Sequence, residues 1–452
     1  MLLFNHSFQQ YNMPIEYSAH SFNYEDYFRR SAEFLGRHRW IFEQSNTKFV
    51  QAGILDALPR TWIEDFRRAS NEELNQIPLA RVNEAWCDDL NQFLRTMDGL
   101  LVEYERKCDG CGENSKMIRG ISPKKLYEIQ NLTSLIGEVC DRNETFLDFG
   151  SGLGYLSQSI HSVHQCRVLG LEGDRYRVQA ALQRQMKLFP NSMKQVKYAQ
   201  HFIEEDSFER IQESLKSEFL EESNPIPLAI VGLHACADLS ITAIKMFLSN
   251  ASISKLVIMP CCYHKLAFGS TDTTFKNFPL SDQLKDALER EPNFIGRPFL
   301  RLGCQQTSAR WKTMTAEEHV SHGLAMFERS LMEAIIESDQ RITKRKDTSS
   351  SNLLETYQLC DETGARLEWS DRHRKRLEEL RNNYSEGGQL AEYLTCLQTC
   401  LQPICENLIL LDRMCYIETE AQRRNICIRS KLVKFANDNL SPRCFVITAE
   451  KG

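Results

Sequence analysis

The fold is decided by the stretch Thr145-Phe-Leu-Asp-Phe-Gly-Ser-Gly-Leu-Gly154. Its first five residues form an apolar run that is typical of a buried strand, and the glycines that follow predict a tight loop. A helical pattern begins at about Tyr155. A strand, a glycine loop and a helix in this order predict the first unit of an open α/β sheet, in which ligands bind at the carboxyl ends of the strands.

The spacing of the glycines separates classes of ligand. The dinucleotide fingerprint is Gly-x-Gly-x-x-Gly, and counted from Gly150 its third glycine would fall on Tyr155. The loop instead has glycines at every second position, Gly150, Gly152 and Gly154, with Ser151 between the first two. No Walker-type lysine follows the loop in the sequence. The pattern therefore disfavours a pyrophosphate ligand, and with it a nicotinamide oxidoreductase.

Two acidic residues complete the predicted ligand site. Asp148 stands two residues before the first glycine, and Glu172 ends the next predicted strand. A carboxylate at that second position can accept hydrogen bonds from both hydroxyls of a ribose. The helix after the loop would offer its amide end to a ligand carboxylate. Acids and glycines together predict a site for an adenosyl ligand without a pyrophosphate, and S-adenosylmethionine fits this description.

Strands and helices alternate around the glycine loop. Ser122-Pro123 is a helix start that precedes the first strand. Later strand patterns cover residues 167–172, 195–202, 228–232 and 255–259, and helical patterns cover residues 175–188, 208–219 and 239–248. Strands separated by helices of this length predict a parallel, doubly wound, Rossmann-like sheet.

The flanks of this α/β region have helical patterns. Thr315-Ala-Glu-Glu318 is a capping box that begins a helix, and an apolar strand-like run starts at Cys444. Four segments are therefore expected: an N-terminal helical domain at 1–120, a Rossmann-like domain at 121–312, a helical insertion at 313–430 and a C-terminal strand within 431–452. That strand is expected to return to the edge of the sheet.

Composition excludes several classes of protein. Of 452 residues, 42% are hydrophobic and 26% are charged, and the net charge of −6 excludes a generally basic, polyanion-coating protein. No apolar run reaches the length of a membrane helix, and the first residues do not resemble a secretory signal. The 16 cysteines include the adjacent pair Cys261-Cys262, which favours a reducing compartment. We therefore expect a cytoplasmic or nuclear protein with no membrane partner.

Six pieces of the sequence together resemble one family. They are Ser122-Pro-Lys-Lys125, Leu147-Asp-Phe-Gly-Ser-Gly-Leu-Gly-Tyr-Leu-Ser157, Gly232-Leu-His-Ala-Cys-Ala-Asp-Leu239, Cys261-Cys-Tyr-His-Lys-Leu266, Phe278-Pro-Leu-Ser281 and Ser441-Pro-Arg443. In this order they resemble class I S-adenosylmethionine-dependent methyltransferases and, more narrowly, the methyltransferase-like protein 25 family. The fourth and fifth strands also resemble, more distantly, a family of transfer-RNA 2′-O-methyltransferases. Ala237 stands where many of those relatives have glycine.

Catalytic candidates lie after the fourth and fifth predicted strands. Methyl transfer needs a nucleophile aligned with the methyl group and, for some acceptors, a base that removes a proton. Those two loops provide Asp238, His264, Tyr263 and His234, for each of which the alternative is a structural hydrogen bond; for His234 a structural or cofactor-backing role is preferred. Lys124 and Lys125, with Cys261 and Cys262, are the expected substrate contacts.

No metal site is expected from the sequence. Cys108-x-x-Cys111 is half of a zinc ligand set, and no second pair follows at the usual spacing. The favoured function is methyl transfer from S-adenosylmethionine to RNA, supported by local basic spots at Lys124, Lys125, Arg301 and Arg310. A protein substrate and a cofactor-binding scaffold without turnover remain the alternatives, and the oligomeric state is left open.

Overall fold

The computed structural model describes residues 15–107, 121–219, 227–271, 273–345 and 352–452. Its internal contacts divide the described chain into two compact units. The first unit contains residues 33–101 and 306–404, and the second contains residues 15–32, 102–305 and 405–452. Cys108 and Cys111 lie outside the described residues.

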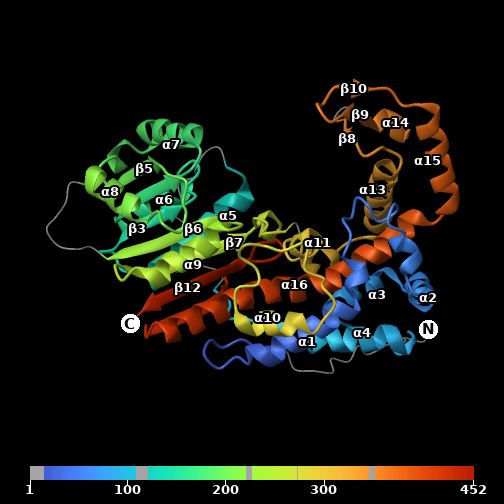
Figure 1. The fold of residues 1–452 in the computed structure, drawn as a ribbon, viewed down its shortest axis with the longest axis horizontal. Helices are drawn as coiled ribbons and strands as arrows, with labels where there is room; N and C mark the ends of the chain where they lie inside the picture. Colours follow the sequence, from blue (N-terminus) through green and yellow to red (C-terminus); the bar gives the residue numbers. More distant parts are fainter. Residues whose placement is uncertain (1–14, 108–120, 220–226, 272, 346–351) are drawn as a thin grey trace, which may run out of the picture. The chain divides into compact units, whose positions relative to one another are not determined.

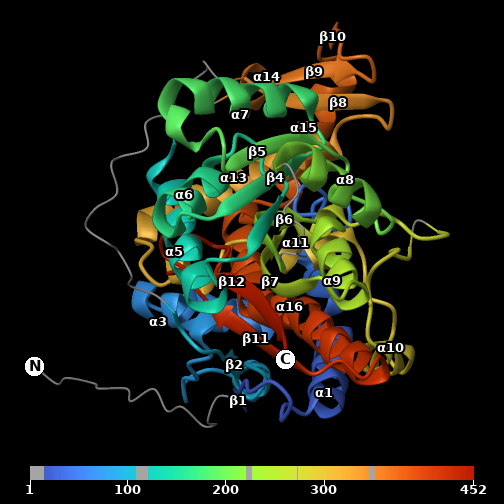
Figure 2. The same cartoon turned by 90° about the vertical axis from the view of Figure 1, so that its left-hand side faces the viewer.

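The second unit is built on a seven-stranded sheet (Figures 1 and 2). The strand order is β11-β12-β7-β6-β3-β4-β5, and only β12 runs antiparallel to its neighbours. The strands are β3 (Thr145–Phe149), β4 (Arg167–Glu172), β5 (Val196–Gln200), β6 (Leu228–Cys236), β7 (Ile253–Cys261), β11 (Ile428–Lys434) and β12 (Phe445–Lys451). This confirms the predicted doubly wound α/β fold.

Both faces of the sheet are covered because alternate side chains of the buried strands point to opposite sides. Phe146 lies opposite Val168 in β4 and Ala229 in β6, and packs in a cluster with α5 (Pro123–Val139), α6 (Tyr155–His164) and α7 (Arg175–Leu188). On the other face, α9 (Leu239–Ser249) packs on β6 and β7. Figure 1 shows α7 on one side of the strands and α9 on the other.

The C-terminal strand returns to the sheet as predicted, but its expected position at the edge is wrong. β12 lies between β7 and β11, with Ile447 paired to Ile258 on one side and to Leu432 on the other. Figure 2 shows β11 and β12 beside β7. The edge strand β11 was not predicted, because its Ile-Arg-Ser-Lys-Leu-Val-Lys sequence alternates weakly and adjoins a long helical pattern.

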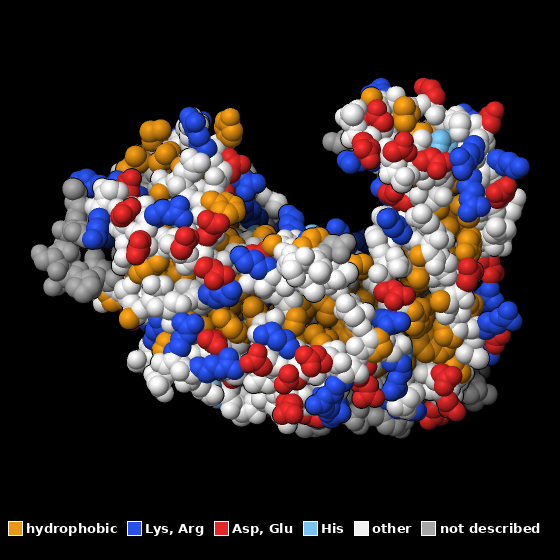
Figure 3. Space-filling model, in the orientation of Figure 1, with side chains coloured by type: hydrophobic (Ala, Val, Ile, Leu, Met, Phe, Trp, Pro, Cys, Tyr) orange, Lys and Arg blue, Asp and Glu red, His pale blue; other side chains and the backbone are white. Residues whose placement is uncertain are grey.

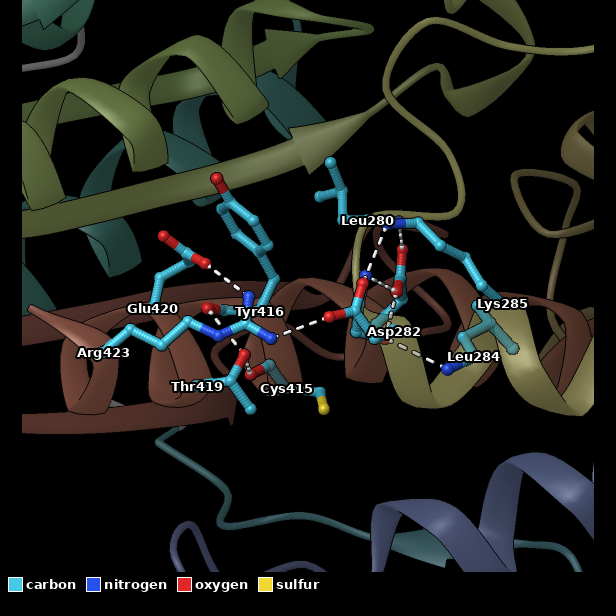
Figure 4. Close-up of polar contacts among 11 residues, drawn as sticks. Leu280, Asp282, Leu284, Lys285, Cys415, Tyr416, Thr419, Glu420 and Arg423 are labelled. Atoms are coloured by element: carbon cyan, nitrogen blue, oxygen red, sulfur yellow. Dashed lines mark hydrogen bonds and ion pairs between the residues drawn. The ribbon is translucent and has the colours of Figure 1, made fainter.

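Helix α10 (Asp282–Glu289) is fastened to α16 (Gly387–Arg423) within the second unit. The buried Asp412 carboxylate accepts hydrogen bonds from the Leu280 and Ser281 amides, each at 2.8 Å, and from the Ser281 hydroxyl at 2.6 Å. Asp282 bonds Arg423 of α16 at 2.7 Å, as Figure 4 shows. The Phe278–Ser281 piece of the sequence thus ends at the N-cap of a helix that is anchored on a buried carboxylate. The remaining elements of this unit are α8 (Phe208–Phe219), α11 (Arg297–Leu302), β1 (Ile15–Glu16) and β2 (Val102–Glu103).

The first unit is helical with a small sheet. Its main helices are α2 (Arg60–Arg68), α3 (Asn71–Gln76), α4 (Asp88–Asp98), α12 (Ser308–Trp311), α13 (Ala316–Ala334), α14 (Leu353–Thr356) and α15 (Asp371–Asn383). An antiparallel sheet joins β8 (Gln340–Lys344), β9 (Tyr357–Asp361) and β10 (Arg366–Leu367). The capping box at Thr315 and Glu318 forms as predicted. Buried His319 bonds Glu392 at 2.5 Å and Asn75 at 2.7 Å, which ties three segments together.

The predicted division into four segments differs from the observed one. Most of the predicted N-terminal domain and most of the predicted insertion pack into a single unit, and α1 (Tyr24–Arg37) and α16 contribute residues to both units. The prediction of purely helical flanks missed the β8–β10 sheet. Contacts such as that between His319 and Asn75 join segments that are far apart in the chain. The local sequence pattern of either segment does not predict which other segment it contacts.

Helix α16 is the one described helix that is long and apolar enough to cross a membrane by length and composition. In the structure, 83% of that apolar window is buried, and the helix carries buried polar side chains such as Glu392, Asp412 and Arg413. Burial among other elements accounts for its apolar composition.

Candidate functional site

The predicted site residues gather at one edge of the sheet because the parallel strands β3 to β7 all end there. The glycine loop follows β3, Glu172 ends β4, and Phe202 follows β5. The segments 234–238 and 261–264 come at the ends of β6 and β7. The sequence therefore places its candidates correctly by strand, and the structure shows what each side chain contacts.

The glycine loop adopts backbone conformations that favour glycine. Gly150, Gly152 and Gly154 have φ of 73°, 57° and 73°. The Gly150 and Ser151 amides donate to the Leu171 carbonyl at 2.9 and 3.1 Å, which holds the loop against β4. A Cβ on Gly154 would collide with the Tyr198 ring, whereas a Cβ on Gly152 would meet nothing closer than the Gly150 carbonyl oxygen at 3.9 Å. Gly152 thus borders open space that a ligand can enter.

The two predicted acids hydrogen-bond to the loop and to the helices around it. Asp148 is only 1% exposed, and its carboxylate accepts a 2.6 Å hydrogen bond from the Ser157 hydroxyl on α6. Burial raises the pKa of Asp148 to about 6, although the Ser157 bond opposes the shift. Glu172 accepts from the Gly152 amide and from the Asp174 amide, each at 3.0 Å. One Glu172 carboxylate therefore joins the glycine loop to the start of α7.

Two further features fit an adenosyl ligand. The Ser151 hydroxyl is buried and has no hydrogen-bond partner among the described residues. Phe202 is 75% exposed and lies next to Gly173, where an added Cβ would be 3.3 Å from the Phe202 ring. Phe202 thus presents an exposed aromatic ring after β5, close to the strand end that carries Glu172, and such a ring offers a flat face on which a base can stack. Sequence reasoning missed Phe202, and the only available signal was an aromatic residue directly after a predicted strand.

The predicted substrate lysines have different surroundings. Lys124 lies 3.7 Å from the buried carboxylate of Glu128. Lys125 lies with its ammonium 4.8 Å from the centre of the Tyr155 ring, at the start of the helix after the glycine loop. Burial lowers the pKa of Lys125, and the nearby Arg177 and Arg184 lower it further. Lys125 is thus next to the helix that follows the glycine loop, whereas Lys124 belongs to a polar network around Glu128.

His234 belongs to the same network. It sits at an irregularity in the β6–β7 pairing, has φ of 60°, and its Nε2 bonds Glu128 at 3.0 Å. The Ser441 hydroxyl donates to the other Glu128 oxygen at 2.6 Å. Burial alone would raise the pKa of Glu128, but the bonds from His234 and Ser441 lower it overall. Glu128 was not among the predicted residues, and it turns His234 toward α5, in keeping with the structural or cofactor-backing role expected for this histidine.

Asp238 and Tyr263 make structural contacts. The Asp238 carboxylate accepts from the Ala267 amide and from the Asn277 side-chain amide, each at 2.8 Å. Tyr263 is buried, and its hydroxyl donates to Glu406 at 3.1 Å. Burial raises the pKa of Tyr263, and Glu406 adds to the shift. A catalytic role for either residue stays a prediction, and the buried position of Tyr263 does not support direct contact with a substrate.

His264 is half-buried, and its Nδ1 lies 3.0 Å from the Cys304 sulfur. Burial lowers the pKa of His264, with Arg301 contributing. Of the two predicted cysteine contacts, Cys261 is buried and Cys262 is partly exposed with φ of 51°. Ala237 also has a left-handed φ of 51°, a backbone conformation that glycine adopts more easily than alanine.

Comparison with known proteins agrees with this geometry. Residues 124–268 match a family described as a methyltransferase domain. Two relatives bear the name "Probable methyltransferase-like protein 25": the Homo sapiens protein is 29% identical over 241 residues, and the Mus musculus protein is 28% identical over 237. Each match covers 49% of this chain, and 36% and 37% of the respective relatives. The matched region therefore spans little more than a third of those proteins.

Solved structures give only distant likenesses. Coclaurine N-methyltransferase bound to N-methylheliamine and S-adenosylhomocysteine is 11% identical, with a TM-score of 0.25 over 95% of both chains. A phosphoethanolamine-type N-methyltransferase of Haemonchus contortus is 13% identical, with a TM-score of 0.22 over 71% of this chain and 51% of that one. The fold is defined by the strand order of the sheet.

The strand order with an antiparallel β12 and the glycine loop are those of a Rossmann-like methyltransferase fold, and residues 124–268 are similar to a methyltransferase domain. About half of the chain is similar to the proteins named methyltransferase-like protein 25, in agreement with the resemblance found in the sequence.

Proposed function

We propose that this chain transfers a methyl group from S-adenosylmethionine and that its acceptor is RNA. The observation that carries the first half is the loop from Gly150 to Gly154, held by Glu172 through the Gly152 amide and bordered by open space at Gly152. When bound, the cofactor supplies an electrophilic methyl group on a sulfonium sulfur.

The residues of the loop have distinct roles in this proposal. Gly152 lets the backbone approach the ligand, and the free lone pairs of Glu172 accept from ribose hydroxyls. Asp148 holds α6 through Ser157 and presents buried negative charge toward a cationic ligand. Phe202 packs against the adenine. The half-buried His264 is the candidate to contact the acceptor, since Asp238 and Tyr263 are engaged in structural bonds.

The RNA half of the proposal rests on the first turn of α7. Arg175, Tyr176 and Arg177 are all exposed there, and Tyr176 is 80% exposed. Figure 3 shows basic and hydrophobic side chains together on the surface over α7. Cations interleaved with an exposed aromatic ring suit phosphates and stacked bases. This patch adjoins Glu172 through Asp174, so it lies next to the proposed cofactor site.

Calorimetry with S-adenosylhomocysteine tests cofactor binding. We expect the wild-type chain to bind and Gly152→Arg to lose binding, since the larger side chain would fill the open space beside the loop. Gly364→Arg is the matched control, because Gly364 also has a positive φ and open surroundings but lies in the other unit. Absence of binding in the wild type would reject the proposal.

Labelling tests the acceptor. Extract from cells that lack the protein is incubated with methyl-labelled S-adenosylmethionine and purified chain, with Gly152→Arg as the inactive control. We expect label in RNA and not in protein. Label in protein alone would replace RNA by a protein acceptor, and binding without any labelling would favour a scaffold without turnover.

A further inference from the structure

Three cysteine sulfurs converge where β6 and β7 end. Cys236 is the last residue of β6 and Cys261 is the last residue of β7, and the two are paired directly across the parallel strands. Their sulfur atoms are 3.0 Å apart. Cys262 follows in a left-handed conformation, and its sulfur lies 3.7 Å from that of Cys261. The β6–β7 irregularity at Gly232 to Ala235 sets this register, which no spacing in the sequence reveals.

The geometry points to a thiolate-bound zinc ion at Cys236, Cys261 and Cys262. All three sulfurs lie within 4.8 Å of one another, and no fourth His, Cys, Asp or Glu in the described part of the chain joins this group. A tetrahedral zinc ion with bonds of about 2.3 Å holds its sulfur ligands about 3.7 Å apart. The Cys261 and Cys262 sulfurs already have this separation, and the Cys236 and Cys261 sulfurs, at 3.0 Å, would have to move apart by about 0.7 Å.

The charge around the cluster agrees with such an ion. Zn²⁺ with three thiolates carries one net negative charge once the three thiol protons have left to solvent. Arg413 is 1% exposed, and two of its guanidinium nitrogens have no hydrogen-bond partner among the described residues. Burial lowers the pKa of Arg413, and its charged form is favoured by Tyr263, then Asp412, then Cys261. An anionic metal–thiolate group at Cys261 would add to the negative charge that Asp412 already provides near this buried cation.

Three protein ligands leave one coordination position for water or another ligand. Cys261 is buried, but Cys236 and Cys262 are partly exposed, so the cluster is accessible from outside. The cysteine cluster lies at the ends of β6 and β7, where the segments that carry Asp238 and His264 begin. The inference stands independently of the proposed methyl transfer, because three soft ligands at these distances suffice for zinc.

Metal analysis of the full chain tests the site. The protein is purified with a thiol reductant and without chelator, supplied with zinc and desalted. Elemental mass spectrometry should then find about one equivalent of zinc per chain. Cys236→Ser and Cys262→Ser should weaken zinc binding at least tenfold in competition with a chromophoric chelator. Cobalt in place of zinc should give sulfur-to-cobalt charge-transfer absorption in the wild type and lose it in both variants. Circular dichroism checks that the variants are folded.

Two controls separate this cluster from other cysteines. Cys360→Ser changes a partly exposed thiol in β9 and should retain the metal. The double variant Cys108→Ser, Cys111→Ser removes the other candidate pair in the sequence and should also retain it. Loss of zinc in that double variant alone, no zinc in the wild type, or a Cys236–Cys261 disulfide in zinc-supplied reduced protein would each overturn the inference.

Discussion

Replacing Gly152 by alanine tests the open space beside the glycine loop with one added carbon. At φ of 57° an alanine is strained by about 1–2 kcal/mol. Its Cβ would meet no protein atom closer than 3.9 Å, so steric cost within the protein is absent. The methyl group would instead occupy the space assigned to the cofactor. We therefore expect modest destabilisation together with a loss of S-adenosylhomocysteine affinity of at least tenfold.

Calorimetry and thermal unfolding of the same samples distinguish strain from obstruction. Gly364→Ala is the matched variant, because Gly364 has φ of 88° and a Cβ added there would meet nothing within 4 Å. Both variants should show similar small losses of stability, and only Gly152→Ala should lose affinity. If Gly152→Ala binds the ligand as tightly as Gly364→Ala does, the space beside Gly152 is not where the cofactor lies.

Four further outcomes follow from buried groups and backbone strain. Because the pKa of Asp148 is raised to about 6, its protonation below that pH should weaken binding of the cationic cofactor about tenfold per unit, with little change above pH 7; Asp148→Asn should flatten this profile in calorimetry. Because the folded state holds the Asp148 proton more tightly than the unfolded state does, the free energy of unfolding should fall as the pH rises from about 4 to 6. Asp148→Asn should also abolish this dependence of stability on pH. Asp412→Ala leaves three donors unpaired and should cost about 3 kcal/mol or more in urea unfolding, whereas Asp282→Ala, which removes an exposed pair, should change little. Ala237→Gly relieves a left-handed φ and should stabilise the protein by about 0.5 kcal/mol, a gain that thermal unfolding would detect and whose absence would mean that the loop relaxes around alanine.

The sequence predicts the central sheet well because its signals are local. The strand run at Thr145, the glycines at every second position and the helix start at Ser122 each depend on neighbouring residues, and each is found in the structure. The strand pattern also places Glu172 at the end of β4, whereas its hydrogen bond to the Gly152 amide was not predicted and its contact with a ribose stays a prediction. The antiparallel insertion of β12 beside β7 was missed, since periodicity identifies a strand but not its neighbour.

The contacts of the candidate side chains could not be predicted in the same way. Glu128 was overlooked because the partners of its carboxylate, His234 and Ser441, are distant in sequence. The same applies to Asp238, whose bond to Asn277 gives it a structural contact that spacing cannot reveal. The proximity of Cys236 to Cys261 depends on the register between β6 and β7, which the sequence does not reveal. Burial and register decide these roles, and both arise from tertiary packing.

The place of β12 in the sheet has a consequence for how the domain assembles. β11 pairs with β12 and, through it alone, joins the other strands, although it is made first. During synthesis, the side of β7 that pairs with β12 therefore stays unpaired until residues 262–444 have been made. Deleting residues 445–451 would detach two strands at once. Such late, long-range closure is slow, and until it is complete the unpaired flank of β7 is exposed to incorrect pairing.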